Sequence, residues 1–434
     1  MDEKFLYHIW DAGHINNSLK TISGKRLNVT YQGQFNTQRG PDFVNAILEI
    51  EGETLNGAVE IHVNTQDWKK HNHQEDEYYN SVILHAVLNH NSTDIHTIKE
   101  NGDLVEIVEL KGQLSDDIVK LMENATPGLP KSGYDYCELL SAIDTDRLLA
   151  ILSIHGRQRF MGKVRRFNAS LSISDFDQIL YEGMMEAIGY DKNKFNMFQL
   201  AQSIAMENLK RWKAEGMDAL SLTSILCCSS GLLVKSINRL DPDSKTKLLA
   251  AYERQQFFGR KISIDWQLFR IRPVNHPLLR LIKLSAFVFH ALPYGLLNYL
   301  IQKVEQESTN PKERYLRFTE LLSAGKSELL SSDTGLGKTV INNIYINIYL
   351  PIMYLYAQKV SDGGLSASVM ESWNSFGALP ENYITRFMGR HINKGQIAKV
   401  NKSSLYQQGL MDIFYRTCRY HLCEECMGQN KLYG

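Results

Sequence analysis

The side chains best suited to binding a metal ion are concentrated near the start of the chain. Eight of the thirteen histidines lie within residues 1–96, and Asp42, Glu60 and Asp76 lie among them. Carboxylate oxygens are the ligands that Mg²⁺ and Mn²⁺ prefer, and an imidazole beside them suits Mn²⁺ or can hold a water molecule in place. These residue types therefore predict a Mg²⁺ or Mn²⁺ site in this part of the chain.

Two sequence motifs carry the first candidate ligands, Gly40-Pro41-Asp42-Phe43 and Val59-Glu60-Ile61-His62. If residues 51–53 form the turn of a hairpin, Asp42 lies opposite His62, and Val44 opposite Glu60, within a residue or two. Side chains alternate along a strand, so Glu60 and His62 share one face while their neighbours point toward a core. We expect Asp42 and Glu60 to bind the metal and His62 to orient the attacking water.

Three further polar residues follow the second motif, namely His71, His73 and Asp76. They have three interpretations: metal ligands, contacts to a substrate phosphate, or solvated side chains on a loop. Asp42 also has a structural alternative, because an acid after a proline is common in turns. Glu60 and His62 could form an exposed strand face. His85 is expected to hydrogen-bond within the sheet.

Short strand-like runs carry these motifs. The expected elements are a helix at 3–10, strands at 26–31, 45–51, 58–64, 82–88 and 105–110, and a short crossover helix within 67–81. A Pro- and Gly-containing run at 126–130 breaks any regular element, and beyond residue 138 apolar residues recur at helical spacing. The predicted fold class is α+β, with an α-β-β-β-α-β mixed sheet in domain 1–125 and an all-helical body over 138–434.

The ordered motifs resemble the PD-(D/E)XK nuclease superfamily, whose restriction-endonuclease-like core is an α-β-β-β-α-β unit. In that superfamily a Pro-Asp opens one strand and a Glu-X-Lys lies on the next, as Pro41-Asp42 and Glu60-Ile61-His62 do here. The resemblance implies that Asp42 and Glu60 hold Mg²⁺, which activates water for phosphodiester hydrolysis. Glu3 occupies the place of an additional acid on the opening helix. His62 replaces the lysine, for which Lys69 or Lys70 could substitute.

A closer resemblance covers most of the chain. The two motifs, together with the later Asp67-Trp68-x-x-His71-x-His73 and Leu84-His85, look like a bacterial family catalogued as domain of unknown function 2851. Further matches to that pattern are Arg272-Pro273-x-Asn275, Ile346-Asn347 with Pro351, and the cysteine-bearing C-terminus. The family has no settled activity, so the resemblance implies a nuclease-like core without specifying its chemistry.

The C-terminal cysteines form a second group of candidate metal ligands. Cys418, Cys423 and Cys426 have spacings found in zinc and iron–sulfur sites, and a fourth ligand could be Cys137 or His421. Some PD-(D/E)XK nucleases hold a [4Fe–4S] cluster with one distant and three C-terminal cysteines, which favours Cys137. The alternative is that these cysteines are free thiols that pack a terminal helix.

Basic residues predict where a polyanion would bind. Lys and Arg together number 48, as do Asp and Glu, but residues 1–110 contain 8 basic and 17 acidic residues, so the rest of the chain is basic. We expect nucleic acid to contact one basic helical face, made of Arg157, Arg159, Lys163, Arg165 and Arg166. The alternatives are an ordinary solvated face and a chance imbalance of charge.

Several other classes of protein are not supported by the sequence. The first residues lack the basic and apolar regions of a secretion signal, and no apolar run is long enough to span a membrane, so we expect a cytoplasmic protein without a membrane partner. Residues 334–339 resemble a phosphate-binding loop. However, Ser332 stands where the full pattern has glycine, so ATP is not expected.

The sequence thus favours a metal-dependent nuclease that uses Asp42, Glu60 and His62. The alternative is a catalytically inactive nuclease-fold protein that binds nucleic acid or protein, for which the histidine in place of lysine is the main support. A third and weaker interpretation is a metal-dependent hydrolase of small molecules. The sequence does not indicate the oligomeric state.

Overall fold

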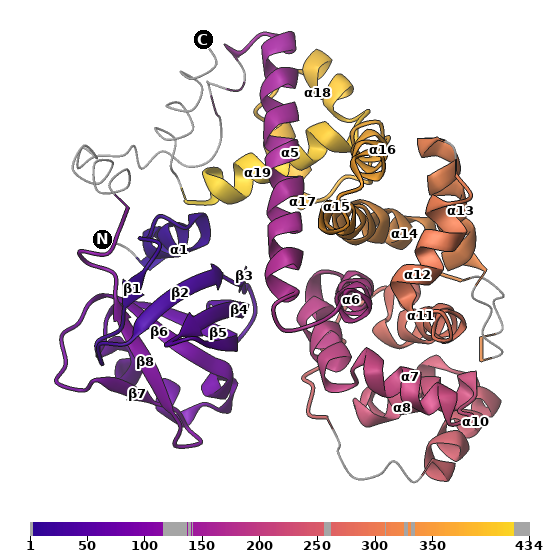
Figure 1. Ribbon diagram of the computed structural model, residues 1–434, viewed down its shortest axis with the longest axis horizontal. Helices are drawn as coiled ribbons and strands as arrows, with labels where there is room; N and C mark the ends of the chain where they lie inside the picture. The colour runs from indigo at the N-terminus through magenta and orange to yellow at the C-terminus, as the bar shows by residue number, and fades with distance from the viewer. Residues whose placement is uncertain are drawn as a thin grey trace. The chain divides into compact units, whose positions relative to one another are not determined.

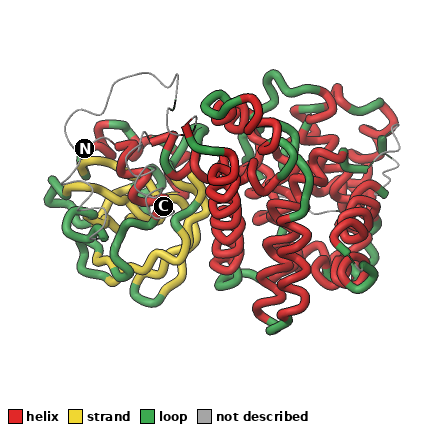
Figure 2. Tube along the Cα trace, turned by 90° about the horizontal axis from the view of Figure 1, so that it is seen from above, coloured by secondary structure: helices red, strands yellow, loops and turns green. Residues whose placement is uncertain are grey.

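The computed structural model of the chain describes residues 3–115, 137, 140, 142–255, 262–308, 310–324, 329–330 and 335–420 (Figure 1). The expected break at 126–130 lies outside these residues. Strands gather in the N-terminal part and helices form most of the remainder (Figure 2). The α+β class, with a mixed sheet followed by a large helical region, is confirmed.

The described strands form one eight-stranded mixed sheet, with the order β1-β2-β4-β5-β6-β8-β7 and β3 paired to β4. The strands are β1 Leu19–Lys20, β2 Arg26–Tyr31, β3 Gln34–Phe35, β4 Phe43–Ile50, β5 Glu53–Asn64, β6 Val82–Asn89, β7 His96–Ile98 and β8 Leu104–Glu109. β5 pairs antiparallel with β4 and parallel with β6. All five expected strands are present, whereas the two- and three-residue strands β1, β3 and β7 were not predicted.

The pairing of β4 with β5 lies at the edge of the expected register, two residues from its centre. Glu51 and Gly52 have φ values of 51° and 86°, as in a two-residue hairpin turn, so β5 already begins at Glu53. A bulge between Phe43 and Ala46 then shifts the pairing again and places Phe43 opposite Val59. Asp42 therefore lies level with Glu60 rather than with His62.

Each face of the sheet is covered by a different segment. Helix α1, Glu3–Ala12, packs Leu6, Ile9 and Trp10 onto the face that carries Val59 and Ile61, and all five side chains are buried. On the other face lies the crossover between β5 and β6, which consists of α2 Asp67–Lys70, η1 His73–Glu75 and η2 Glu77–Ser81. Glu60 and His62 point to this second face, as the alternation along the strand predicts.

Helices make up nearly all regular structure after the sheet. They are α5 Thr145–Ser170, α6 Phe176–Ser203, α7 Met206–Ala214, α8 Ala219–Ser229, α9 Leu232–Lys235, α10 Pro242–Arg254, α11 Pro277–Ala291, α12 Leu296–Leu300, α13 Pro311–Ser323, α14 Lys338–Ile344, α15 Leu350–Lys359, α16 Gly363–Asn374, α17 Tyr383–Gly389, α18 Lys394–Val400 and α19 Ser404–Arg416. Two π-helical turns, η5 Ile301–Glu305 and η6 Tyr345–Tyr349, continue α12 and α14. Apolar side chains of α5 to α16, together with Leu405 of α19, form one large core that includes Phe160 and Phe167.

The chain divides into two compact units whose boundaries differ from the expected ranges 1–125 and 138–434. The first unit comprises Met1–His155, Tyr383–Ile397 and Gly409–Gly434, and the second comprises Gly156–Asn382 and Ala398–Gln408. Within the first unit, late segments bind early ones: Arg419 pairs with Asp11 at 2.6 Å, and Asp412 with His155 at 2.8 Å. Such pairs cannot be read from local sequence patterns.

Among the described residues, no single helix has both the length and the apolar composition that crossing a membrane requires. Pro277–Ala291 and Leu296–Glu305 meet that test only when taken together, and they are bent by 87°.

Candidate functional site

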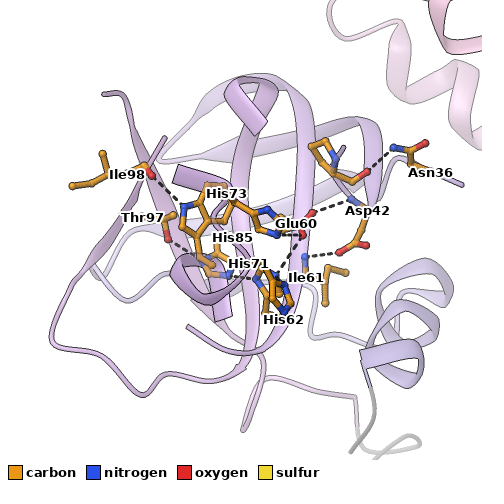
Figure 3. Close-up of polar contacts among 12 residues, drawn as sticks. Asn36, Asp42, Glu60, Ile61, His62, His71, His73, His85, Thr97 and Ile98 are labelled. Carbon is orange, nitrogen blue, oxygen red and sulfur yellow. Dashed lines mark hydrogen bonds and ion pairs between the residues drawn. The ribbon is translucent and has the colours of Figure 1, made fainter. Parts of the chain in front are cut away.

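The carboxyl groups of Asp42 and Glu60 each accept a backbone hydrogen bond from the opposite side of the β4–β5 hairpin (Figure 3). The Asp42 backbone N–H donates to Glu60 Oε2 at 3.0 Å, and the Ile61 N–H donates to Asp42 Oδ2 at 2.9 Å. This reciprocal pair fixes both carboxyl groups at the end of β5 nearest the crossover. The expectation that Asp42 and Glu60 converge therefore agrees with the geometry.

Burial makes both carboxyl groups hard to ionise. It raises the pKa of Asp42 to about 8, an effect that the nearby Glu60 charge reinforces and hydrogen bonds from Ile61 and Tyr7 oppose. Burial also raises the pKa of Glu60 to about 8, with Glu3 adding repulsion. Two acids that hold their protons near neutral pH would release them to solvent when a cation binds, because a cation favours the charged form.

His62 lies next to this pair and belongs to a chain of buried hydrogen bonds. Its Nδ1 is 2.9 Å from His85 Nε2, and His85 Nδ1 is 2.8 Å from Thr97 Oγ1. Burial lowers the pKa of His62 to about 2 and that of His85 to about 3, so both rings are neutral. If Thr97 accepts from His85 and His85 accepts from His62, the lone pair of His62 Nε2 points away from this chain.

That Nε2 atom faces two more histidines from the crossover. It lies 3.1 Å from His71 Nδ1 and 3.5 Å from Glu60 Oε1. Asn72, with φ of 61°, is left-handed, and this turn lets His71 and His73 both reach the sheet. The three imidazoles each offer one nitrogen within 4.8 Å of the others, with His62 and His73 buried and His71 exposed.

His73 supplies the least satisfied atom of this group. Its Nε2 is 3.2 Å from Glu60 Oε1, but the contact lacks hydrogen-bond geometry, so this buried nitrogen has no hydrogen-bond partner among the described residues. The ring stacks on Tyr79 with centroids 3.7 Å apart and meets the edge of Trp68 at 5.3 Å. A nitrogen held in this way has no freedom to turn toward solvent, which fits a metal ligand.

Asp76, for which metal ligation was one of three interpretations, does not join this cluster. Its carboxylate accepts from the Tyr78 N–H at 3.1 Å, capping η2, and from Arg39 Nη2 at 3.0 Å. The hydrogen bonds from Tyr78 and Arg39, with the Arg39 charge, outweigh partial burial and lower the pKa of Asp76. Arg39 also lies over the Tyr78 ring at 4.3 Å. We describe Asp76 as a structural residue beside the site.

Residues 3–379 match the family described as Protein of unknown function (DUF2851). The chain belongs to this family. The matched region includes every residue of the carboxylate and histidine cluster, whereas Cys418 and the C-terminal cysteines lie beyond it. No curated protein and no solved structure matches the chain.

The DUF2851 chain uses part of its predicted basic face internally. Arg159 donates to Gln408 Oε1 at 2.7 Å, and Arg166 pairs with Glu186. Burial, together with the charges of these two arginines, lowers the pKa of Lys163 well below its usual value. Of the five predicted nucleic-acid contacts, Arg157 and Arg165 are exposed on α5. The face is therefore smaller than the sequence suggests.

The predicted cysteine cluster is described only in part. Cys418 is half-buried in η7, Cys418–Tyr420, and Cys137 is half-buried with its backbone N–H donating to His391 Nδ1 at 3.0 Å. Cys423, Cys426 and His421 lie outside the described residues. Zinc or iron–sulfur binding at these cysteines stays a prediction.

Three residues of the site could not be assigned a role from the sequence. Thr97 ends the hydrogen-bond chain from His62, Tyr7 donates to the Asp42 carboxylate, and Arg39 reaches the crossover from the loop before Asp42. Each depends on a tertiary contact. Only the position of Arg39, three residues before Asp42, offers a local signal.

Proposed function

We propose that this DUF2851 protein is a metal-dependent hydrolase that cleaves phosphodiester bonds in nucleic acid. The observation that carries the proposal is the convergence of Glu60 with neutral imidazole nitrogens, beside a second carboxyl group at Asp42. The order of α1, β2, β4, β5, α2 and β6 agrees with the α-β-β-β-α-β order of the PD-(D/E)XK core, with Asp42 directly before β4 and Glu60 on β5. That agreement supports a restriction-endonuclease-like relationship.

A divalent ion at this site would supply Lewis acidity and lower the pKa of a water molecule. Glu60 would anchor the ion, and His62 would be held in position by His85. Asp42 lies beside Glu60 with Oδ2 fixed by the Ile61 N–H. We assign Asp42 to the metal's immediate surroundings, where it would accept or return a proton during attack on phosphorus.

Arg39 is the residue best placed to contact a substrate phosphate. Its side chain is 68% exposed, and one edge of the guanidinium is held by Asp76 and the Tyr78 ring. A guanidinium held in this way keeps further N–H groups for a phosphate oxygen. The exposed Arg157 and Arg165 on α5 would add non-specific attraction for a polyanion.

The test is cleavage of supercoiled DNA, single-stranded DNA and RNA with Mn²⁺, Zn²⁺ or Mg²⁺. Wild type should cleave at least one of them, and Glu60→Gln should not, while Glu53→Gln, an exposed acid at the hairpin end of β5, should leave cleavage unchanged. Retained nucleic-acid affinity without cleavage under any ion would contradict the proposal and favour the catalytically inactive binding module. Cleavage that survives Glu60→Gln would contradict the assigned site.

A further inference from the structure

The geometry points to a site for one first-row transition-metal ion, held by Glu60, His62, His71 and His73, that rejects Mg²⁺. The sequence suggested two carboxylates as the ligands, with a hard cation between them. In the structure, the side chains that converge are three imidazoles and one carboxylate. This inference names the ion that hydrolysis would use, and in that respect it rests on the proposed function. Metal binding can nevertheless be measured without any substrate.

The separations of the donor atoms fit one metal ion. Zn–N and Zn–O bonds of about 2.0–2.1 Å place two ligands of a tetrahedron roughly 3.3 Å apart. Glu60 Oε1 lies 3.5 Å from His62 Nε2 and 3.2 Å from His73 Nε2, and His62 Nε2 lies 3.1 Å from His71 Nδ1. The ligand nitrogens of His62, His71 and His73 lie within 4.8 Å of one another, so these three imidazoles can share one ion, and Glu60 Oε1 would add a fourth ligand on the side of His62 and His73.

The unsatisfied nitrogen of His73 is an independent indication. The His73 side chain is 10% exposed, and its Nε2 faces Glu60 without forming a hydrogen bond to any described residue. Burying such an atom without a partner costs free energy, commonly about 1–3 kcal/mol. A metal ion between His73 and Glu60 would satisfy the nitrogen and the carboxylate together.

The residues behind the cluster have the arrangement that orients a metal-binding imidazole. In the tautomer in which His62 binds through Nε2, its Nδ1–H would donate to His85 Nε2 at 2.9 Å and the His85 Nδ1–H to Thr97 Oγ1 at 2.8 Å. Outer hydrogen bonds of this kind fix the tautomer and the ring plane of a ligand. Stacking on Tyr79 fixes the ring plane of His73.

The donor set determines which ions are accepted. Imidazole suits zinc, iron, nickel and copper, whereas Mg²⁺ prefers oxygen ligands and gives up its waters reluctantly. Asp42 is not needed as a ligand, because its Oδ2 is engaged by the Ile61 N–H and the Tyr7 hydroxyl donates to the same carboxyl group. The three imidazole ligands therefore favour transition-metal ions over Mg²⁺ at this site.

Cobalt titration of the metal-free full chain tests this inference. Co²⁺ should give visible absorption bands that saturate at one ion per chain, are displaced by Zn²⁺ and persist in excess Mg²⁺. His71→Ala, at an exposed position, and His73→Phe, which retains the stack on Tyr79, should each abolish the bands. Thr97→Val should weaken binding by about tenfold or more, through loss of the outer hydrogen bond. His96→Gln, on β7 outside the cluster, should bind as wild type does.

Bands that are unchanged in both His71→Ala and His73→Phe would overturn the inference, as would displacement of Co²⁺ by Mg²⁺ at comparable concentration. Cobalt binding without cleavage of nucleic acid would contradict the proposed function and leave this site standing. Mg²⁺-supported cleavage that survives both histidine variants would contradict this metal site and leave the proposed function standing.

Discussion

Glu60 is the residue on which the chemistry of this protein depends, because its two oxygens face different partners. Oε2 accepts from the Asp42 N–H, and Oε1 lies beside His62 and His73. One oxygen thus maintains the strand pairing while the other is directed at the imidazoles. The residue is 5% exposed, so its charge requires compensation from within the site.

The raised carboxyl pKa values predict how metal-free stability depends on pH. Asp42 and Glu60 titrate near pH 8 when folded and near 3.8 and 4.5 when unfolded, so their contribution to stability is present at low pH and is lost as pH rises to about 8. His62 and His85, whose pKa values are lowered from 6.5, contribute above pH 6.5 and lose that contribution below it. Between pH 6.5 and 8 the carboxyl groups alone vary within this set.

We therefore expect chelator-treated protein to lose stability between pH 6.5 and 8, measured by urea denaturation. Asp42→Asn combined with Glu60→Gln should flatten this dependence, because the two titrating groups are absent. Metal binding should release protons over the same range, detectable by calorimetry in buffers of different ionisation enthalpy. A wild-type protein that gains stability over this range would contradict the assignment of raised pKa values.

Arg39 provides a separate prediction about the substrate. Arg39→Met should raise KM about tenfold with a smaller change in kcat, because a charge-assisted hydrogen bond to phosphate contributes about 1.5–3 kcal/mol. The matched control is Arg26→Met, an exposed arginine at the start of β2 and near the hairpin turn rather than the site. Equal effects of the two variants on KM would show that Arg39 contributes only to overall charge.

At the scale of elements, the bulge in β4 sets the geometry of the acid pair. Asn45 has φ of 58°, and the register of β4 against β5 shifts between Phe43 and Ala46. Gly33 lies against this bulge, where an added Cβ would meet the Val44 carbonyl oxygen at 2.9 Å. The irregularity therefore lets Asp42 meet Glu60, as bulges near functional sites commonly do by redirecting a side chain.

A change at the bulge tests this role. Asn45→Val should destabilise the protein by about 1–2 kcal/mol, because a β-branched residue disfavours positive φ, whereas Asn45→Gly should be tolerated. Because the Asp42 N–H holds the ligand Glu60 through Oε2, Asn45→Val should also reduce metal affinity. Unfolding free energies and Mn²⁺ calorimetry of the two variants check both parts. Equal behaviour of the valine and glycine variants would show that the left-handed conformation is dispensable.

The sequence predicts the helices and strands better than it predicts which residues of different elements contact one another. Hydrophobic alternation and turn residues located α1 and the five longer strands, because those signals are local. The alignment of Asp42 with Glu60 depends on the bulge, and the approach of His71 and His73 to His62 depends on the left-handed Asn72. For Asp76 the residue type left metal ligation, a phosphate contact and a solvated loop position open, and its place in the turn makes it a cap for η2.

At the scale of the whole molecule, the first unit is assembled from segments distant in the sequence. Asp412, which is 4% exposed, accepts from His155 Nδ1 at 2.8 Å and from Arg416 Nε at 3.1 Å. Gln396 Nε2 likewise donates to the Ile143 carbonyl at 2.7 Å. The integrity of this unit thus depends on residues far beyond the sheet, which composition alone did not indicate.

Asp412→Ala should therefore lower the stability of the protein by about 1–3 kcal/mol, because a buried imidazole loses its partner. Asp412→Asn, which keeps a hydrogen-bond acceptor, should cost less. Cobalt binding should survive in the folded variant, since no residue of the metal site contacts Asp412. Thermal melting followed by circular dichroism measures the effect, and an alanine variant that melts as wild type does would show that the pair is dispensable.

The most direct test of the whole account is a crystal structure of the protein grown with Mn²⁺ or Zn²⁺, with anomalous diffraction recorded at the absorption edge of the metal. We predict one strong peak between Glu60 Oε1 and the facing nitrogens of His62, His71 and His73. A peak bound by Asp42 and Glu60 without the histidines would contradict the proposed ligand set. Absence of any peak at Glu60 under saturating metal would contradict metal-dependent hydrolysis at this site.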